Sequence, residues 1–97
     1  MNKEYLPIGS VVLLKGADKR LMIFGIMPIN LDEDKQHDYI GCLYPEGFLG
    51  SESTYLFNSE DIDKIDFIGF TDIEHQAFVS ALNQHLENEK EVADGHL

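Results

Sequence analysis

Cys42 and four histidines are the side chains best suited to nucleophilic or metal chemistry, and their spacing favours neither. Cys42 lies between Gly41 and Leu43, with no basic neighbour or helix start in the sequence to lower its pKa. His75 and His85 are ten residues apart, about 280° around a helix, so they do not share a face. We therefore expect a buried structural thiol, no metal site and no cofactor.

The acidic segment around Asp32 resembles a calcium-binding loop only in its composition. Such loops need a Gly at the sixth position and a Glu at the twelfth, where this chain has His37 and Leu43. Carboxylate pairs for acid–base chemistry occur at any spacing by chance in a chain with 18 acidic residues. No phosphate loop, nucleophile elbow or zinc-protease motif is present in the sequence, so we predict that the protein is not an enzyme.

Length and charge predict one acidic domain spanning residues 1–97. The formal net charge of −11 opposes binding to nucleic acids and anionic membranes, and it favours a basic partner or simply keeps the protein in solution. The longest apolar run, residues 21–29, is interrupted by Gly25 and Pro28, and the polar first residues predict no signal peptide. A single cysteine suits a reducing compartment, so a cytoplasmic location is expected.

Short apolar segments separated by turn residues predict a β-meander over residues 8–70. The expected strands are residues 10–15, 20–27, 39–44, 53–58 and 62–70. Gly41 inside the third strand indicates a bulge or a close approach of two backbones. Residues 30–38 are expected to form a mobile loop, and Tyr44–Gly47 is expected to form a type I turn with Pro45 at its second position.

The apolar period changes from two to 3.6 after Phe70, which predicts a helix over residues 71–88. The expected apolar stripe is Ile73, Ala77, Phe78, Ala81, Leu82 and Leu86. Thr71 is expected to cap the helix with Glu74, and residues 89–97 are expected to form a frayed acidic tail. The predicted fold class is α+β: a strongly bent five-stranded antiparallel meander or partly open barrel, with one C-terminal helix packed on it.

Phe48 and Leu49 are apolar residues in a segment that otherwise has the composition of a loop. They form either a binding tip or a segment that folds back onto the core. Together with Tyr44, and with Glu46 and Glu52 as an acidic rim, they are the predicted contacts for a protein partner with a basic or apolar segment.

Three stretches of the chain resemble domain of unknown function 4176: residues 5–16, residues 20–23 and residues 39–47, which end in Tyr-Pro-Glu-Gly. The similarity continues to about residue 85 and contains no catalytic motif. Proteins that look like this are small and cytoplasmic, and Gram-positive bacteria often encode them beside type VII secretion effectors, especially toxins with an LXG targeting domain. The resemblance therefore implies an accessory factor that binds an effector before export.

The leading hypothesis is a non-enzymatic accessory binding protein, a cytoplasmic chaperone or adaptor for a type VII-secreted effector or toxin. The partner would dock on apolar residues or add a strand to an exposed sheet edge. Three alternatives remain open: an immunity protein that inhibits a toxin, a small ligand-binding barrel or enzyme, and a homo-oligomer that shares the helix stripe between subunits.

Overall fold

The computed structural model describes residues 3–27, 29–30 and 35–95. These residues form seven strands and one long helix, with two short 3₁₀ turns, η1 (Ser51–Ser53) and η2 (Ser59–Asp61). The chain divides into two compact units, one formed by Leu6–Phe70 and the other by Met1–Tyr5 with Thr71–Leu97. The predicted packing of the helix on the sheet remains a prediction.

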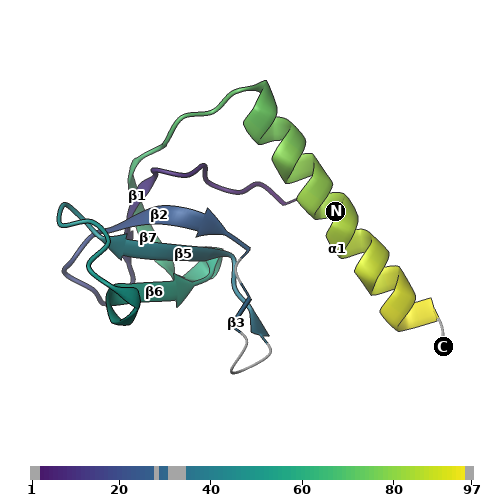
Figure 1. The fold of residues 1–97 in the computed structure, drawn as a ribbon, viewed down its shortest axis with the longest axis horizontal. Helices are drawn as coiled ribbons and strands as arrows, with labels where there is room; N and C mark the ends of the chain where they lie inside the picture. The colour runs from purple at the N-terminus through teal and green to yellow at the C-terminus, as the bar shows by residue number, and fades with distance from the viewer. Residues whose placement is uncertain (1–2, 28, 31–34, 96–97) are drawn as a thin grey trace. The chain divides into compact units, whose positions relative to one another are not determined.

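Five strands form an antiparallel sheet in the unit Leu6–Phe70, as the sequence predicted (Figure 1). They are β1 (Val11–Leu14), β2 (Leu21–Ile26), β5 (Tyr39–Leu43), β6 (Thr54–Phe57) and β7 (Ile62–Phe67). Each lies inside one of the predicted strands. The order across the sheet is β6-β5-β2-β1-β7, so the last strand pairs with the first and not with its predecessor. This is the order of an up-and-down barrel opened between β6 and β7.

The short connection between β6 and β7 requires the sheet to curve. In a flat sheet the two edge strands would lie four spacings apart, roughly 19 Å. The step from Phe57 to Ile62 spans at most about 18 Å when fully extended, and part of it is taken up by the turn η2. The edges of the sheet must therefore approach each other where β6 leads into β7, which agrees with the predicted strong bend.

Extra residues in two strands help to produce this curvature. Val11 pairs with Phe67 and Val12 with Ile65, so Asp66 is an extra residue in β7. In the β2–β5 ladder the extra residue is Phe24, because Ile23 pairs with Gly41 and Gly25 with Ile40. Bulges of this kind bend a strand and redirect the side chain of the extra residue.

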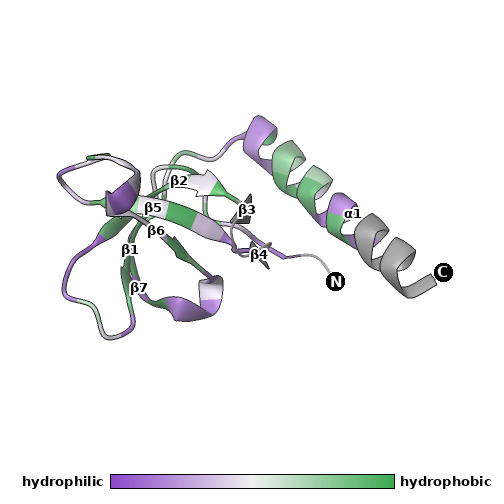
Figure 2. Cartoon of the chain, turned by 60° about the horizontal axis from the view of Figure 1, so that its bottom comes forward, coloured by the Kyte–Doolittle hydropathy of each residue, from purple (hydrophilic) through white to green (hydrophobic). Residues whose placement is uncertain are grey.

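The core lies on the inner face of the curved sheet. Its largest fully buried side chains are Tyr39, Phe57, Ile23 and Val12. The Tyr39 and Phe57 rings are 5.5 Å apart between centroids, because their residues are directly paired across β5 and β6. Figure 2 shows the hydrophobic residues (green) concentrated along the strands of the sheet and the hydrophilic residues (purple) in the turns between them. Cys42 is a buried free thiol, as predicted.

Gly41 makes the close approach that its position in the third strand predicted. An added Cβ would lie 3.0 Å from the Met22 carbonyl oxygen and 3.2 Å from a ring carbon of Phe57. Because Gly41 has no side chain, the backbone of β2 and the Phe57 ring can pack directly against it.

Two predicted loops differ from the structure. The expected mobile loop over residues 30–38 contains paired residues, because β3 (Ile29–Asn30) and β4 (Lys35–Gln36) form a small hairpin; residues 31–34 lie outside the described residues. The expected type I turn is also wrong. Its closing hydrogen bond runs from the Gly47 N–H to the Leu43 carbonyl at 2.7 Å, and the Tyr44–Pro45 peptide is cis.

The other unit contains the helix α1 (Ile73–Gly95), which differs from the predicted helix at both ends. Asp72, and not Thr71, is the cap: its Oδ1 accepts the His75 N–H at 2.9 Å. The helix continues through most of the predicted tail, because residues 89–94 include the good helix formers Glu, Lys and Ala. In the same unit the buried Asn83 side chain bonds both main-chain polar groups of Lys3, each at 2.9 Å.

Candidate functional site

A row of three apolar side chains crosses the outer face of the sheet. Val11 on β1 is paired with Met22 on β2 and with Phe67 on β7, and directly opposed residues point to the same face. The central Val11 is small and nearly buried, whereas Phe67 keeps 60% of its surface exposed. A short side chain between two long ones leaves a depression, so the register itself builds a groove.

The groove has a volume of about 530 Å³. Its lining residues are Gly9, Val11, Arg20, Met22, Tyr44, Asp66 and Phe67. All of them belong to the unit Leu6–Phe70, and three of them, Gly9, Arg20 and Tyr44, lie outside the strands. Tyr44, one of the predicted contacts, is held at the groove because its N–H donates to the Arg20 carbonyl at 3.0 Å. The groove is mostly apolar, with charged groups supplied by Arg20 and Asp66 alone.

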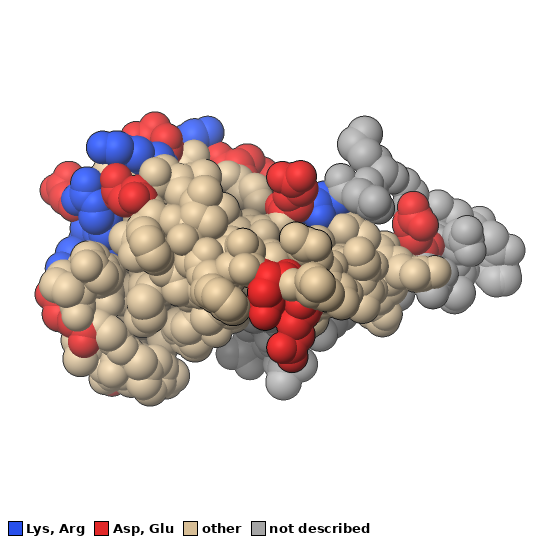
Figure 3. Space-filling model, turned by 90° about the horizontal axis from the view of Figure 1, so that it is seen from above, with Lys and Arg blue, Asp and Glu red and all other residues tan. Residues whose placement is uncertain are grey.

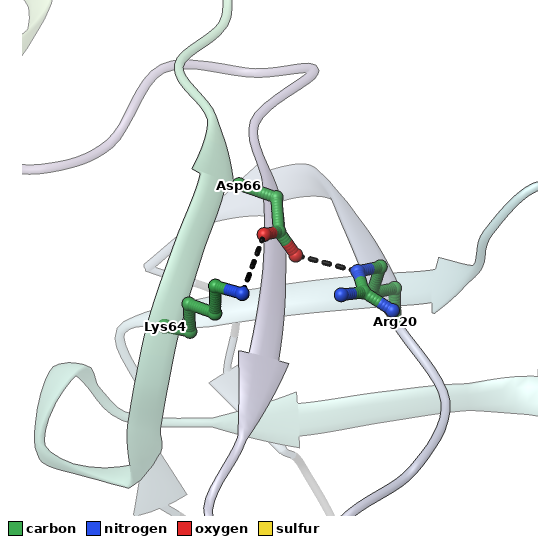
Figure 4. A network of polar contacts seen from close by, with 3 residues as sticks. All are labelled: Arg20, Lys64 and Asp66. Atoms are coloured by element: carbon green, nitrogen blue, oxygen red, sulfur yellow. Dashed lines mark hydrogen bonds and ion pairs between the residues drawn. The ribbon is translucent and has the colours of Figure 1, made fainter.

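An ion pair crosses β1 beside this groove (Figure 4). Arg20 Nε donates to Asp66 Oδ2 at 2.6 Å, and Lys64 Nζ lies 3.8 Å from the other carboxylate oxygen. Asp66 reaches these partners as the extra residue of the β7 bulge. No local signal predicts this arrangement. Arg20 and Asp66 lie 46 positions apart, Arg20 directly before β2 and Asp66 on β7, and these two strands are not neighbours in the sheet.

Loop 44–50, which joins β5 to η1, holds four of the five predicted contacts. Phe48 and Leu49 expose 63% and 59% of their surfaces, so neither is folded back into the core. The Phe48 ring meets Phe24 edge-on, with centroids 6.0 Å apart and planes at 76°. Phe24 is the extra residue of the β2 bulge, two positions from Met22 of the groove. Loop and groove are therefore connected through the aromatic pair and Tyr44.

The predicted acidic rim is only partly available to a partner. Lys19 Nζ lies 2.7 Å from Glu46 Oε1, and this contact lowers the pKa of the Glu46 carboxyl below its ordinary value. Glu52 is exposed in η1 and makes no ion pair with the described residues. Figure 3 shows Lys and Arg side chains gathered at one end of the sheet unit, with Asp and Glu among them.

Loop 44–50 and the groove offer exposed apolar surface and a few charged groups, which are means of binding a ligand. Among residues 3–27, 29–30 and 35–95 there is no cluster of three His, Cys, Asp or Glu side chains that could hold a metal ion. Over the same residues, no helix is long and apolar enough to cross a membrane.

A family model described as a domain of unknown function (DUF4176) matches residues 5–78. The match covers most of the chain, and the protein therefore belongs to this family. It includes every residue of the groove and of loop 44–50. No match was found among curated proteins or among solved structures.

Proposed function

We propose that the protein is a non-enzymatic binding protein that holds an apolar segment of a protein partner against loop 44–50 and the adjoining groove. The observation that carries the proposal is the exposure of Phe48 and Leu49 beside an open apolar groove. Large apolar side chains that are exposed together are typical of interaction sites. Aromatic side chains and Met are enriched in the cores of protein interfaces, and both occur at this site.

The partner class that we propose is a secreted effector or toxin of a type VII secretion locus, bound in the cytoplasm before export. Its basis is the resemblance of the chain, and the family found for residues 5–78 has no assigned function. The net charge of −11 supports a partner with basic residues around its apolar segment. In this role the protein would act as a chaperone or adaptor and carry out no chemical step.

The edges of the sheet favour docking on its face over the addition of a strand. At β6, the Thr54 N–H is bonded to the Ser51 carbonyl and the Asn58 N–H to an Asp61 carboxylate oxygen. Because backbone groups alternate in direction along a strand, the Leu56 N–H is left as the outward donor between them. Short edges of this kind resist pairing with another chain.

The other edge strand is protected by charge. Three of the six residues of β7 are charged, namely Asp63, Lys64 and Asp66, and two of them are the extra residues of bulges. Charged side chains and bulges on an edge strand both discourage the pairing of a further strand. The apolar groove and loop 44–50 therefore remain as the surface that we propose for the partner.

Co-purification with a candidate effector tests the proposal. The tagged protein and the secreted toxin encoded beside it are produced together, and their affinity is measured for wild type, Phe48→Ser and Leu49→Ser. Loss of a contact at the centre of an interface costs about 2 kcal/mol or more, which is roughly 30-fold in affinity. Tyr55→Ser is the matched control, because Tyr55 is also exposed but lies on β6, outside the site. Unchanged affinity in both loop variants would contradict the proposed surface.

A further inference from the structure

We propose that the groove binds the C-terminal end of a peptide, with Arg20 taking the terminal carboxylate and the apolar row taking the last side chain. This inference rests on the proposed function and names the chemistry of the segment that is bound. Its basis is the combination of one partly used guanidinium, a local excess of positive charge and an open apolar row on the same face of the sheet.

Arg20 is fixed in place while most of its donors remain free. Its Nε is bonded to Asp66 (Figure 4), and among the described residues neither terminal nitrogen of Arg20 makes a hydrogen bond or an ion pair. A guanidinium has five N–H donors, so about four are left for a ligand. Their planar fork matches a carboxylate, and a charged pair of this kind is stronger than a neutral hydrogen bond. The side chain is 42% exposed, so a ligand can reach it.

The charges around the groove favour an anionic group although the protein is acidic. In the ion-pair cluster at the groove, two cations, Arg20 and Lys64, share one carboxylate, that of Asp66, which leaves one positive charge in excess within the cluster. The whole unit Leu6–Phe70 has eleven acidic and five basic residues. The cluster is therefore a local cationic site on a negative unit. One ligand carboxylate would neutralise it, while basic residues elsewhere in the partner segment would face the acidic remainder of the unit.

The groove is large enough for a terminal residue. Its volume of about 530 Å³ lies in the range of roughly 300–1,000 Å³ that is usual for ligand sites. In a terminal residue, the carboxylate and the side chain leave the same Cα, so both groups can reach a single short groove. Met22 and Phe67 would flank the apolar side chain over the floor made by Val11. Capture of a terminal carboxylate is a recurring mode of peptide recognition.

Fluorescence anisotropy with the full-length protein tests this site. The probes are labelled hexapeptides ending in Phe, Leu, Ile or Met, each made as the free acid and as the C-terminal amide. At least one free acid should bind about tenfold more tightly than its amide, the factor expected for one hydrogen bond to a charged group. Arg20→Met should abolish this difference. Lys15→Met should retain it, since Lys15 is an exposed cation that does not line the groove.

Three results would overturn the inference. They are equal affinity of acid and amide peptides, equally tight binding of an amidated peptide with an internal Asp, and no binding of any free acid up to about 1 mM. If Arg20→Met fails to fold, Arg20→Lys can replace it, because Lys keeps the charge but lacks the planar guanidinium. The comparison of acid and amide peptides on the wild-type protein still decides whether a terminal carboxylate is recognised. Effector capture that depends on Phe48 would uphold the proposed function even if all peptides fail, so the two failures are distinguishable.

Discussion

Replacing Gly41 with Ala tests the packing that holds β5 against its neighbours. The new Cβ would lie 3.0 Å from the Met22 carbonyl oxygen, 3.2 Å from Phe57 Cε1 and 3.4 Å from Leu21 Cβ. The first contact is with the backbone of a central strand and the second is with a ring that is 2% exposed, so neither can yield easily.

The size of the effect follows from two opposed terms. Overpacking of a well-packed core costs about 1–3 kcal/mol. Ala is better than Gly in a strand interior by about 0.5–1 kcal/mol, which offsets part of that cost. We therefore expect Gly41→Ala to lower the free energy of unfolding by about 1–2 kcal/mol. In a chain of this length, that corresponds to a fall in Tm of about 5–15 °C.

Thermal and urea unfolding followed by circular dichroism measure this change. The Phe57→Leu background provides a double-mutant cycle, because it removes the ring atom that lies 3.2 Å from the new Cβ. Gly41→Ala should cost less in that background than in wild type. If a Cβ had room there, Gly41→Ala would be more stable than wild type by about 0.5–1 kcal/mol, and that result would refute the register between β2 and β5.

Three further predictions concern single contacts. Asn83→Ala should lower the free energy of unfolding by about 1 kcal/mol, because the loss of two hydrogen bonds to Lys3 is only partly offset by the better helix propensity of Ala. Amide hydrogen exchange at residues 3–5 should become faster. An unchanged exchange rate would show that Asn83 does not hold the Lys3 backbone. Asp72→Ala should cost about 1 kcal/mol through loss of the cap, whereas Thr71→Ala should change stability much less. The pKa of Glu46 is lowered by its hydrogen bond from Lys19, so the stability from this contact is present above the ordinary Glu pKa and lost as the pH falls through the lowered one. An NMR titration should show that pKa rising in Lys19→Met, and an unchanged value would be the contrary result.

The strands could be predicted because their signals are local. Alternation and turn residues place a strand within one to three residues of its ends, and all five predicted strands are found in the sheet. Turn chemistry was less informative, since Pro45 and Gly47 were compatible with the expected type I turn and the hydrogen bond closes one residue earlier. The predicted cap, Thr71, differs from the observed cap, Asp72, for a similar reason. Thr and Asp are both good capping residues, and the sequence alone does not choose between two neighbouring ones.

The groove could not be predicted, because it depends on pairing between distant strands. Neither Val11 nor Phe67 carries a local signal for their pairing, and β7 lies beside β1 only because the chain returns to the first strand. The bulge that brings Asp66 to Arg20 is equally non-local. Asn83 offered little signal, because the positions one turn away include the apolar Val79 and Leu86 but also the polar Ser80 and Glu87.

The loop contacts stand between these cases. Two apolar residues in a loop segment suggested a tip, and the structure leaves Phe48 and Leu49 exposed. The acidic rim was predicted from residue type alone, and a cation 27 positions away neutralises one of its two members. Charged residues in a sequence therefore predict a binding surface less well than apolar residues do, because a charged side chain can pair with a residue that is distant in the sequence.

Binding of a protein partner through loop 44–50 and the groove can be tested in the native host. The most direct measurement is affinity purification of the tagged protein from its native host at low and high salt, with Phe48→Ser in parallel, followed by mass spectrometry. We expect one neighbouring secreted effector to be recovered stoichiometrically with the wild-type protein, and we expect this effector to be missing with Phe48→Ser. Recovery of the protein alone at both salt concentrations, or of the same effector with both proteins, would contradict it.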